Sequence, residues 1–175
     1  MISEESLKFI MPYATKRVGQ YVRQLNDAMD EFEVNTLPRQ CAFLAQIAHE
    51  SGELRYVREL DSGEAYEGRA DLGNTEPGDG VRFKGRGLIQ ITGRANYAAC
   101  GDALGADFVS DPELLERPDF ACRSAGWFWK THGLNELADN GAFEQITRRI
   151  NGGTNGLADR QAYLRRAKIE LGDTA

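Results

Sequence analysis

A glycine-rich stretch separates two parts of the chain that follow helical patterns. Between Asp61 and Gly87 lie seven glycines and Pro77. That density excludes a regular helix, because glycine and proline both break helices. A loop this long inside a compact chain is usually functional. We therefore expect turns through most of the stretch and a short β-hairpin at Val81–Lys84, where apolar and polar residues alternate.

Apolar residues recur at three- and four-residue steps on both sides of this stretch, which predicts helices. Thr36 and Pro38 are typical of a helix start, and Gly52 of a helix end. The helical patterns cover residues 3–32 with a break at position 12, 37–52, a start at 111–114, 123–129, 143–150 and 157–171. The predicted fold is mainly α, and the absence of repeats and linkers predicts one catalytic domain, residues 1–175.

Composition and charge exclude several classes of protein. Hydrophobic residues make up 41% of the chain and charged residues 27%, as in soluble globular proteins. A net charge of −6 argues against a nucleic-acid partner. No run of about 18 apolar residues could cross a membrane, and the first residues lack the pattern of a secretory signal. We therefore expect a protein made and held in the host cytoplasm.

The metal-binding residue types are too few and too scattered for a metal site. Three cysteines show no paired short spacing, and the chain has two histidines. We expect neither a metal nor another cofactor. Cys41 lies in an apolar helical run, which predicts a buried, reduced thiol.

Glu50 is the best candidate for a catalytic carboxyl. It ends a largely apolar helix and directly precedes the glycine-rich stretch. Burial disfavours the charged form of a carboxyl, which helps to keep it protonated as a general acid requires. The alternative is an ordinary surface glutamate on the last helical turn.

One reaction that uses a protonated carboxyl, glycoside hydrolysis, also uses a second carboxylate, which stabilises the cation or activates water. Glu59 follows Glu50 by nine positions, about 13 Å along a straight helix, but Gly52 allows the chain to turn and bring it across a cleft. Glu64 and Glu67 lie in the same region, and spacing does not decide among the three.

A second informative stretch is Gly85–Gly93, which reads GRGLIQITG. If Leu88–Thr92 is extended, Gln90 and Thr92 lie on the same side, where an amide and a hydroxyl suit a water molecule or a sugar acetamide. The alternative is a buried turn whose polar groups satisfy the backbone. The tryptophans at 127 and 129 occupy helical positions that favour the core.

Four motifs in this order resemble those of glycoside hydrolase family 19, the chitinase group. The helix FLAQIAHESG resembles the family helix that carries the general acid in a His-Glu pair, and VREL resembles the segment of the second glutamate. GRGLIQIT followed by Asn96 is similar to a family signature, and INGG followed by Asp159-Arg160 is similar to its C-terminal element.

The resemblance implies a lysozyme-like fold of two helical lobes around a cleft, with a small irregular or β-hairpin region beside it. It also implies an inverting mechanism, in which the two carboxyls lie roughly 6.5–9.5 Å apart. The implied catalytic residues are Glu50 as the acid, Glu59 as the base and Thr92 as the group that orients water. The implied substrate-binding residues are His49, Gln90, Asn96, Asn151 and Arg160, of which Arg160 would tune the acidic pair.

Some positions depart from the plant members of this family. The chain lacks their insertion before the second glutamate and their disulfides, and it has Ala95 and Asn155 where they carry an aromatic and an acidic residue. These departures favour the phage and prophage endolysin branch, which cleaves peptidoglycan. We expect a monomer that leaves the cytoplasm with the help of a holin and acts on the cell wall or periplasm.

Three alternatives remain open at this point. A bacterial chitinase or chitosanase-like hydrolase would cut a related polymer. A lytic transglycosylase needs an acid and no water activator, so Glu59 and Thr92 argue against it. A catalytically inactive glycan-binding module would have lost Glu50, which this chain retains.

Overall fold

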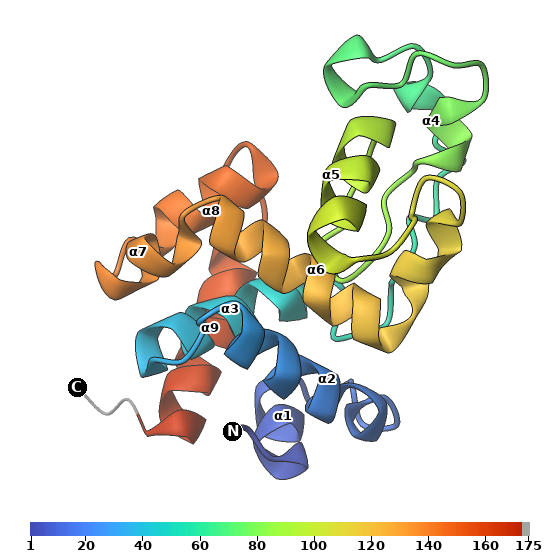
Figure 1. The fold of residues 1–175 in the computed structure, drawn as a ribbon. Helices are drawn as coiled ribbons and strands as arrows, with labels where there is room; N and C mark the ends of the chain where they lie inside the picture. The colour runs from blue at the N-terminus through green and yellow to red at the C-terminus, as the bar shows by residue number, and fades with distance from the viewer. Residues whose placement is uncertain (173–175) are drawn as a thin grey trace.

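The computed structural model describes residues 1–172 and confirms a mainly helical chain (Figure 1). None of its helices is long and apolar enough to cross a membrane within the described residues. The elements, with 3-10 helices marked η, are α1 Glu4–Ile10, α2 Val18–Glu31, α3 Leu37–Glu50, η1 Glu64–Tyr66, η2 Ala70–Leu72, α4 Asp79–Arg82, α5 Arg94–Leu104, η3 Pro112–Glu116, α6 Pro118–Thr131, α7 Leu134–Asp139, α8 Phe143–Asn151 and α9 Leu157–Leu171.

Helix α3 is the central element of the larger lobe. Its residues from Cys41 to Ala48 are all buried, because α9 packs closely along it and α1 and α7 also contact it. Cys41 is buried and is in no disulfide among the described residues, as expected. A helix enclosed on several sides has little freedom to move, so the residue at its end, Glu50, occupies a fixed position.

The chain forms two lobes, which Figure 1 shows in different colours. Residues 53–117, with α4 and α5, form the smaller lobe, and α6 runs from this lobe to the larger one. The smaller lobe is largely irregular because its glycines allow turns: Gly63, Gly73 and Gly93 all have positive φ and backbone or Cβ atoms where a side chain would lie. The mainly helical, two-lobed expectation is confirmed.

The predicted hairpin at Val81–Lys84 is wrong. Residues Asp79–Arg82 form the short helix α4 instead. The Asp79 carboxylate accepts a hydrogen bond from the Glu76 N–H at 3.0 Å and pairs with Arg94 at 2.6 Å, which fixes the start of the helix. β-pairing occurs nearby as isolated bridges, Arg58 with Arg86 and Arg86 with Ile91.

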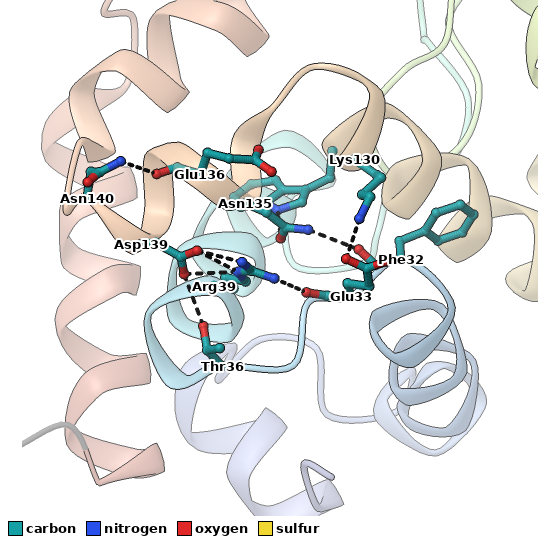
Figure 2. Close-up of polar contacts among 10 residues, drawn as sticks. Phe32, Glu33, Thr36, Arg39, Lys130, Asn135, Glu136, Asp139 and Asn140 are labelled. Carbon is teal, nitrogen blue, oxygen red and sulfur yellow. Dashed lines mark hydrogen bonds and ion pairs between the residues drawn. The ribbon is translucent and has the colours of Figure 1, made fainter.

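Polar contacts fix the beginning of α3 against α6 and α7 (Figure 2). Arg39 pairs with Asp139 at 2.5 Å and donates to the carbonyl of Glu33 at 2.8 Å. Thr36 begins the helix but makes no capping bond with its side chain, which donates to Asp139 at 3.4 Å instead. Asn135 accepts from the indole N–H of buried Trp129 at 2.9 Å. The helix that ends at Glu50 is thus held at both its start and its middle.

Candidate active site

The chain reverses direction immediately after α3. Gly52, Glu53 and Leu54 have φ values of 54°, 58° and 65°. Successive positive φ values make a left-handed turn, which is sterically costly for residues other than glycine. Ser51 supports the turn by accepting a hydrogen bond from the Leu54 N–H at 2.8 Å. The expected break at Gly52 is confirmed, and it sends the chain towards Glu59.

Glu50 forms an ion pair with Arg160 of α9, with 2.5 Å between Oε1 and Nη2. The Glu50 side chain is 19% exposed and the Arg160 side chain is 2% exposed. The Glu50 Oε1 atom itself is buried. Oε2 is therefore the carboxyl oxygen that can face the solvent.

Arg160 is held by further acceptors behind this pair. Its Nε donates to the carbonyl of Asn155 at 3.2 Å, and its Nη1 donates to Gln46. The Gln46 amide in turn donates to Thr147 at 2.9 Å. Gln46, Thr147 and Arg160 are all buried. Arg160 is therefore part of a buried polar chain rather than of a solvated basic surface.

Replacing Arg160 with Met is expected to destabilise the protein by about 3 kcal/mol, because it leaves the buried acceptors on Glu50 and Gln46 without a donor. Urea unfolding measures this change. The control is Arg123→Met, which breaks a more exposed pair with Glu31 and should cost less than about 1 kcal/mol. Equal losses in the two variants would contradict the role given to the buried chain.

Glu59 is fixed on the smaller lobe by two donors. The Tyr66 hydroxyl donates to Oε1 at 2.8 Å, and the Gly85 N–H donates to Oε2 at 2.9 Å. Burial and the contact with Glu59 raise the pKa of Tyr66 to about 12, so the phenol keeps its proton and remains a donor. An ionised carboxylate only accepts hydrogen bonds, which suits both contacts.

The structure distinguishes the two rival glutamates from Glu59. Glu67 accepts from the N–H groups of Gly78 and Gly80 at 2.7 and 2.8 Å, so it organises the turn before α4. Glu64 is exposed in η1. Glu59 combines partial burial with a fixed geometry, which favours it as the second carboxylate.

A side chain at Gly85 would crowd Gln90 and Glu59. A Cβ there would lie 2.7 Å from Gln90 Oε1 and 3.2 Å from Glu59 Oε2. The Glu59 N–H also donates to the Gly85 carbonyl at 2.9 Å. Arg86 beside it pairs with Glu116 at 2.9 Å and donates to Tyr97 at 3.0 Å. The glycine-arginine-glycine segment therefore brings its backbone close to Glu59.

Leu88–Thr92 is not extended, and the alternative, a turn whose polar groups satisfy the backbone, is confirmed. The chain turns at Leu88–Gln90, and Gln90 has a φ of 60°. The turn is closed by the paired backbones of Arg86 and Ile91. The Gln90 amide donates to the Gly87 carbonyl at 2.9 Å, so part of this side chain stabilises the turn.

Gln90, Thr92 and Asn96 nevertheless line one hollow of about 200 Å³. Asn96 is exposed and donates to the Thr92 carbonyl at 2.8 Å, and the Thr92 hydroxyl donates to the Gln90 carbonyl at 2.9 Å. A hollow with an amide, a hydroxyl and a second amide matches the polar groups that a sugar acetamide would need.

Sequence reasoning missed two residues of this hollow. Trp127 was assigned to the core, but it is half-buried and lines the hollow, whereas Trp129 is fully buried. His132 also lines it, stacked on Phe128 with 3.8 Å between ring centroids. Residues two positions apart lie on nearly opposite faces of a helix, so both rings could not face the core. Trp129 faces it and packs edge-on against Phe43, with 5.3 Å between ring centroids.

His49 and Asn151 lie outside the residues that line this hollow. His49 Nδ1 contacts Asp159 Oδ2 at 2.7 Å, and its ring packs where a Cβ on Gly156 would be. This geometry makes His49 a link between α3 and α9 beside Glu50. Asn151 is exposed at the end of α8, next to Ile150, which does line the hollow.

These features define a class of protein before any comparison is made. A mainly helical chain carries one carboxyl, Glu50, against a buried arginine and a second, Glu59, held by two donors on the smaller lobe. The Gly85 that donates to Glu59 lies next to Gln90, which lines a polar and aromatic hollow. No cluster of potential metal ligands occurs among residues 1–172. Two such carboxylates are the groups that a glycosidase uses for acid and base chemistry.

Comparisons with known proteins agree with this class. Residues 36–152 match the family model described as chitinase class I. A glycosyl hydrolase family 19 domain-containing protein of Haemophilus influenzae is 35% identical over 99% of this chain and 98% of its own length. An endochitinase of Arabidopsis thaliana is 36% identical, over 77% of this chain and 48% of the plant protein. The chain thus spans about half of that plant relative.

Solved structures show the same fold. Chitinase C from Streptomyces griseus superposes with a TM-score of 0.81 at 26% identity, covering 98% of this chain and 76% of that chain. A bacterial family 19 chitinase gives a TM-score of 0.77 at 26% identity, covering 97% and 94%. The chain belongs to glycoside hydrolase family 19, and it is a chitinase-like glycosidase.

Proposed function

We propose that this protein hydrolyses the β-1,4 bonds of peptidoglycan glycan strands by an inverting acid-base mechanism. The observation that carries the proposal is the contrast between its two carboxyls. Glu50 has one oxygen buried against Arg160, while Glu59 accepts hydrogen bonds on both oxygens. Two carboxyls in such different surroundings can take different roles in one reaction.

In this mechanism Glu50 donates a proton from Oε2 to the leaving glycosidic oxygen. Glu59 removes a proton from a water molecule, which attacks the anomeric carbon from the opposite face of the sugar ring. Thr92 orients that water, and Gln90 and Asn96 bind the N-acetyl group. A single displacement of this kind converts a β-linkage into a product with the α configuration.

Two positions support peptidoglycan over chitin. Peptidoglycan carries a lactyl-peptide on every second sugar, so an enzyme that binds it needs space beside the glycan strand for these groups. Ala95 and Asn96 are exposed beside the hollow, and Ala95 offers only a methyl group. Asn155 contributes its backbone carbonyl to Arg160, and its side chain places no charge there. In this proposal the enzyme is a monomer that a holin releases from the host cytoplasm onto the wall.

Chitin is the second candidate, because the plant relative is named an endochitinase and the Streptomyces neighbour a chitinase. Nothing in the polar hollow requires a muramic acid, since both polymers carry the N-acetyl group that Gln90 and Asn96 would bind. The two substrates therefore have to be compared directly.

The test is digestion of purified peptidoglycan and of chitin hexamers side by side, with mass spectrometry and NMR of the new ends. We expect reducing muropeptides from peptidoglycan, initially as the α-anomer, at a higher rate than products from chitin. Faster cleavage of chitin would establish the second candidate. Anhydro-muramic ends would instead identify a lytic transglycosylase, and binding without turnover an inactive module.

A further inference from the structure

A second hollow lies behind the left-handed turn that follows Glu50. Its volume is about 490 Å³, and it shares no lining residue with the hollow at Gln90 and Asn96. Its walls come from three parts of the chain: the α1–α2 connection, the turn itself and α9. The mechanism above makes no use of it.

Glu53 is the residue that holds these three parts together. It is 3% exposed, and its carboxylate accepts from the Tyr13 N–H at 2.5 Å and from the Tyr163 hydroxyl at 2.7 Å. Its own carbonyl accepts from Arg17 Nε and Nη2 at 3.4 and 3.3 Å. Both oxygens of the Glu53 carboxylate are therefore occupied by donors within the protein.

The remaining charged groups on the walls are positive. Arg17 lies at the wall with its guanidinium fixed by the Glu53 and Tyr13 carbonyls. Arg55 is exposed and lies 5.0 Å from the centroid of the Tyr56 ring. Glu53 is the one carboxylate among the described residues that line the hollow. A protein with a net charge of −6 thus presents two guanidinium groups around one concave site.

Aromatic side chains complete the site. The Tyr13 side chain is 79% exposed, which is unusual for a large ring on a folded protein. Tyr56 and Tyr163 line the same hollow. Aromatic rings offer flat apolar surface and a polar hydroxyl, and guanidinium groups bind carboxylates through paired hydrogen bonds. The combination fits a ligand that has both an anionic group and a ring or an apolar portion.

We propose that this hollow is an accessory binding site for a carboxylate-bearing muropeptide, separate from the catalytic cleft. Arg55 binds a free carboxylate of the peptide stem, with the Arg17 guanidinium as a fixed positive charge beside it, and the tyrosine rings contact the adjoining residues or sugar. The identity of the ligand rests on the proposed function, because chitin carries no carboxylate. The hollow lies close to Glu50 along the chain. Glu53 follows Glu50 in the left-handed turn and Tyr163 follows Arg160 on α9, so the Glu53–Tyr163 hydrogen bond lies beside the Glu50–Arg160 ion pair in sequence.

The test measures binding of a disaccharide-tetrapeptide muropeptide to the Glu50→Gln protein, which prevents turnover. We expect Arg55→Ala to weaken this binding at least about tenfold, because it removes a charged hydrogen-bond donor. The matched control is Arg23→Ala, which removes the same charge from α2, where the side chain is 84% exposed. The control should leave the affinity unchanged. A muropeptide with amidated carboxyls, and neutral chitotetraose, should bind equally well with and without Arg55.

Two results would overturn the site. One is an equal loss of affinity in the Arg55 and Arg23 variants, which would indicate attraction by overall charge. The other is an affinity for the muropeptide that does not depend on Arg55. If the binding contrast holds while the wild-type protein fails to cleave peptidoglycan, the proposed function fails and the site stands. If the wild-type protein cleaves peptidoglycan but the Arg55 and Arg23 variants do not differ in binding, the proposed function stands and the accessory site fails.

Discussion

Replacing Glu50 with Gln should lower the rate of glycan hydrolysis at least about 100-fold, the usual contribution of one general acid. Gln keeps the size of the side chain and can still accept a hydrogen bond from Arg160, but it has no proton to donate at the required acidity. The initial rate of reducing-end release from peptidoglycan, at saturating substrate, measures the loss. Binding of substrate should change little, so the loss should be in kcat rather than KM.

The control for this variant is Glu31→Gln. Glu31 also pairs with an arginine, Arg123 at 2.7 Å, but neither residue lines the hollow at Gln90 and Asn96. Its removal should leave hydrolysis unchanged. A Glu50→Gln protein that remains folded by circular dichroism and retains more than about a tenth of the wild-type rate would show that the acid lies elsewhere.

Replacing Glu59 with Gln should also lower hydrolysis about 100-fold, because the attacking water loses its base. The Gln amide oxygen can still accept from the Gly85 N–H, and its amide nitrogen can donate to the Tyr66 hydroxyl, so the smaller lobe should remain folded. Added azide should restore part of the rate in this variant, since a small anion can attack without a base. The same addition should not rescue Glu50→Gln with a natural leaving group, which separates the base from the acid.

Glu64→Gln and Glu67→Gln are the comparison variants for Glu59. We expect Glu64→Gln to keep the full rate, because that side chain is exposed in η1. Glu67→Gln should lower the free energy of unfolding, because the turn at Gly78 and Gly80 loses a charged acceptor. It should change kcat little. If either variant lost as much activity as Glu59→Gln, the base would have to be reassigned.

Local patterns predicted α2, α3, α8 and α9 well, because helix formation and helix ends depend on neighbouring residues, but they did not predict α5 or α7. The last helix, 157–171, has the predicted bounds. The first helical pattern is interrupted between α1 and α2, as predicted from Pro12. The smaller lobe was less predictable. Alternation at Val81–Lys84 resembles a strand, but the Asp79 contact with Arg94, distant in sequence, stabilises a helix there.

The site shows the same division between local and long-range information. Glu50 could be chosen from its helix and Glu59 from its resemblance to a family segment. The partners of these carboxyls could not be predicted from spacing alone. Tyr66 and the Gly85 N–H reach Glu59 only through the fold of the smaller lobe, and the exposure of Trp127 depends on how that lobe meets α6.

The pairing of Glu50 with Arg160 determines how late in the synthesis of the chain the Glu50 site can form. The arginine belongs to α9, the last helix described, so the ribosome makes it long after Glu50. Until that helix docks, α3 lacks the packing partner along its length and the acid lacks its counter-charge. We therefore expect the Glu50 site to form only after α9 has been made, and a product truncated before α9 to lack glycosidase activity.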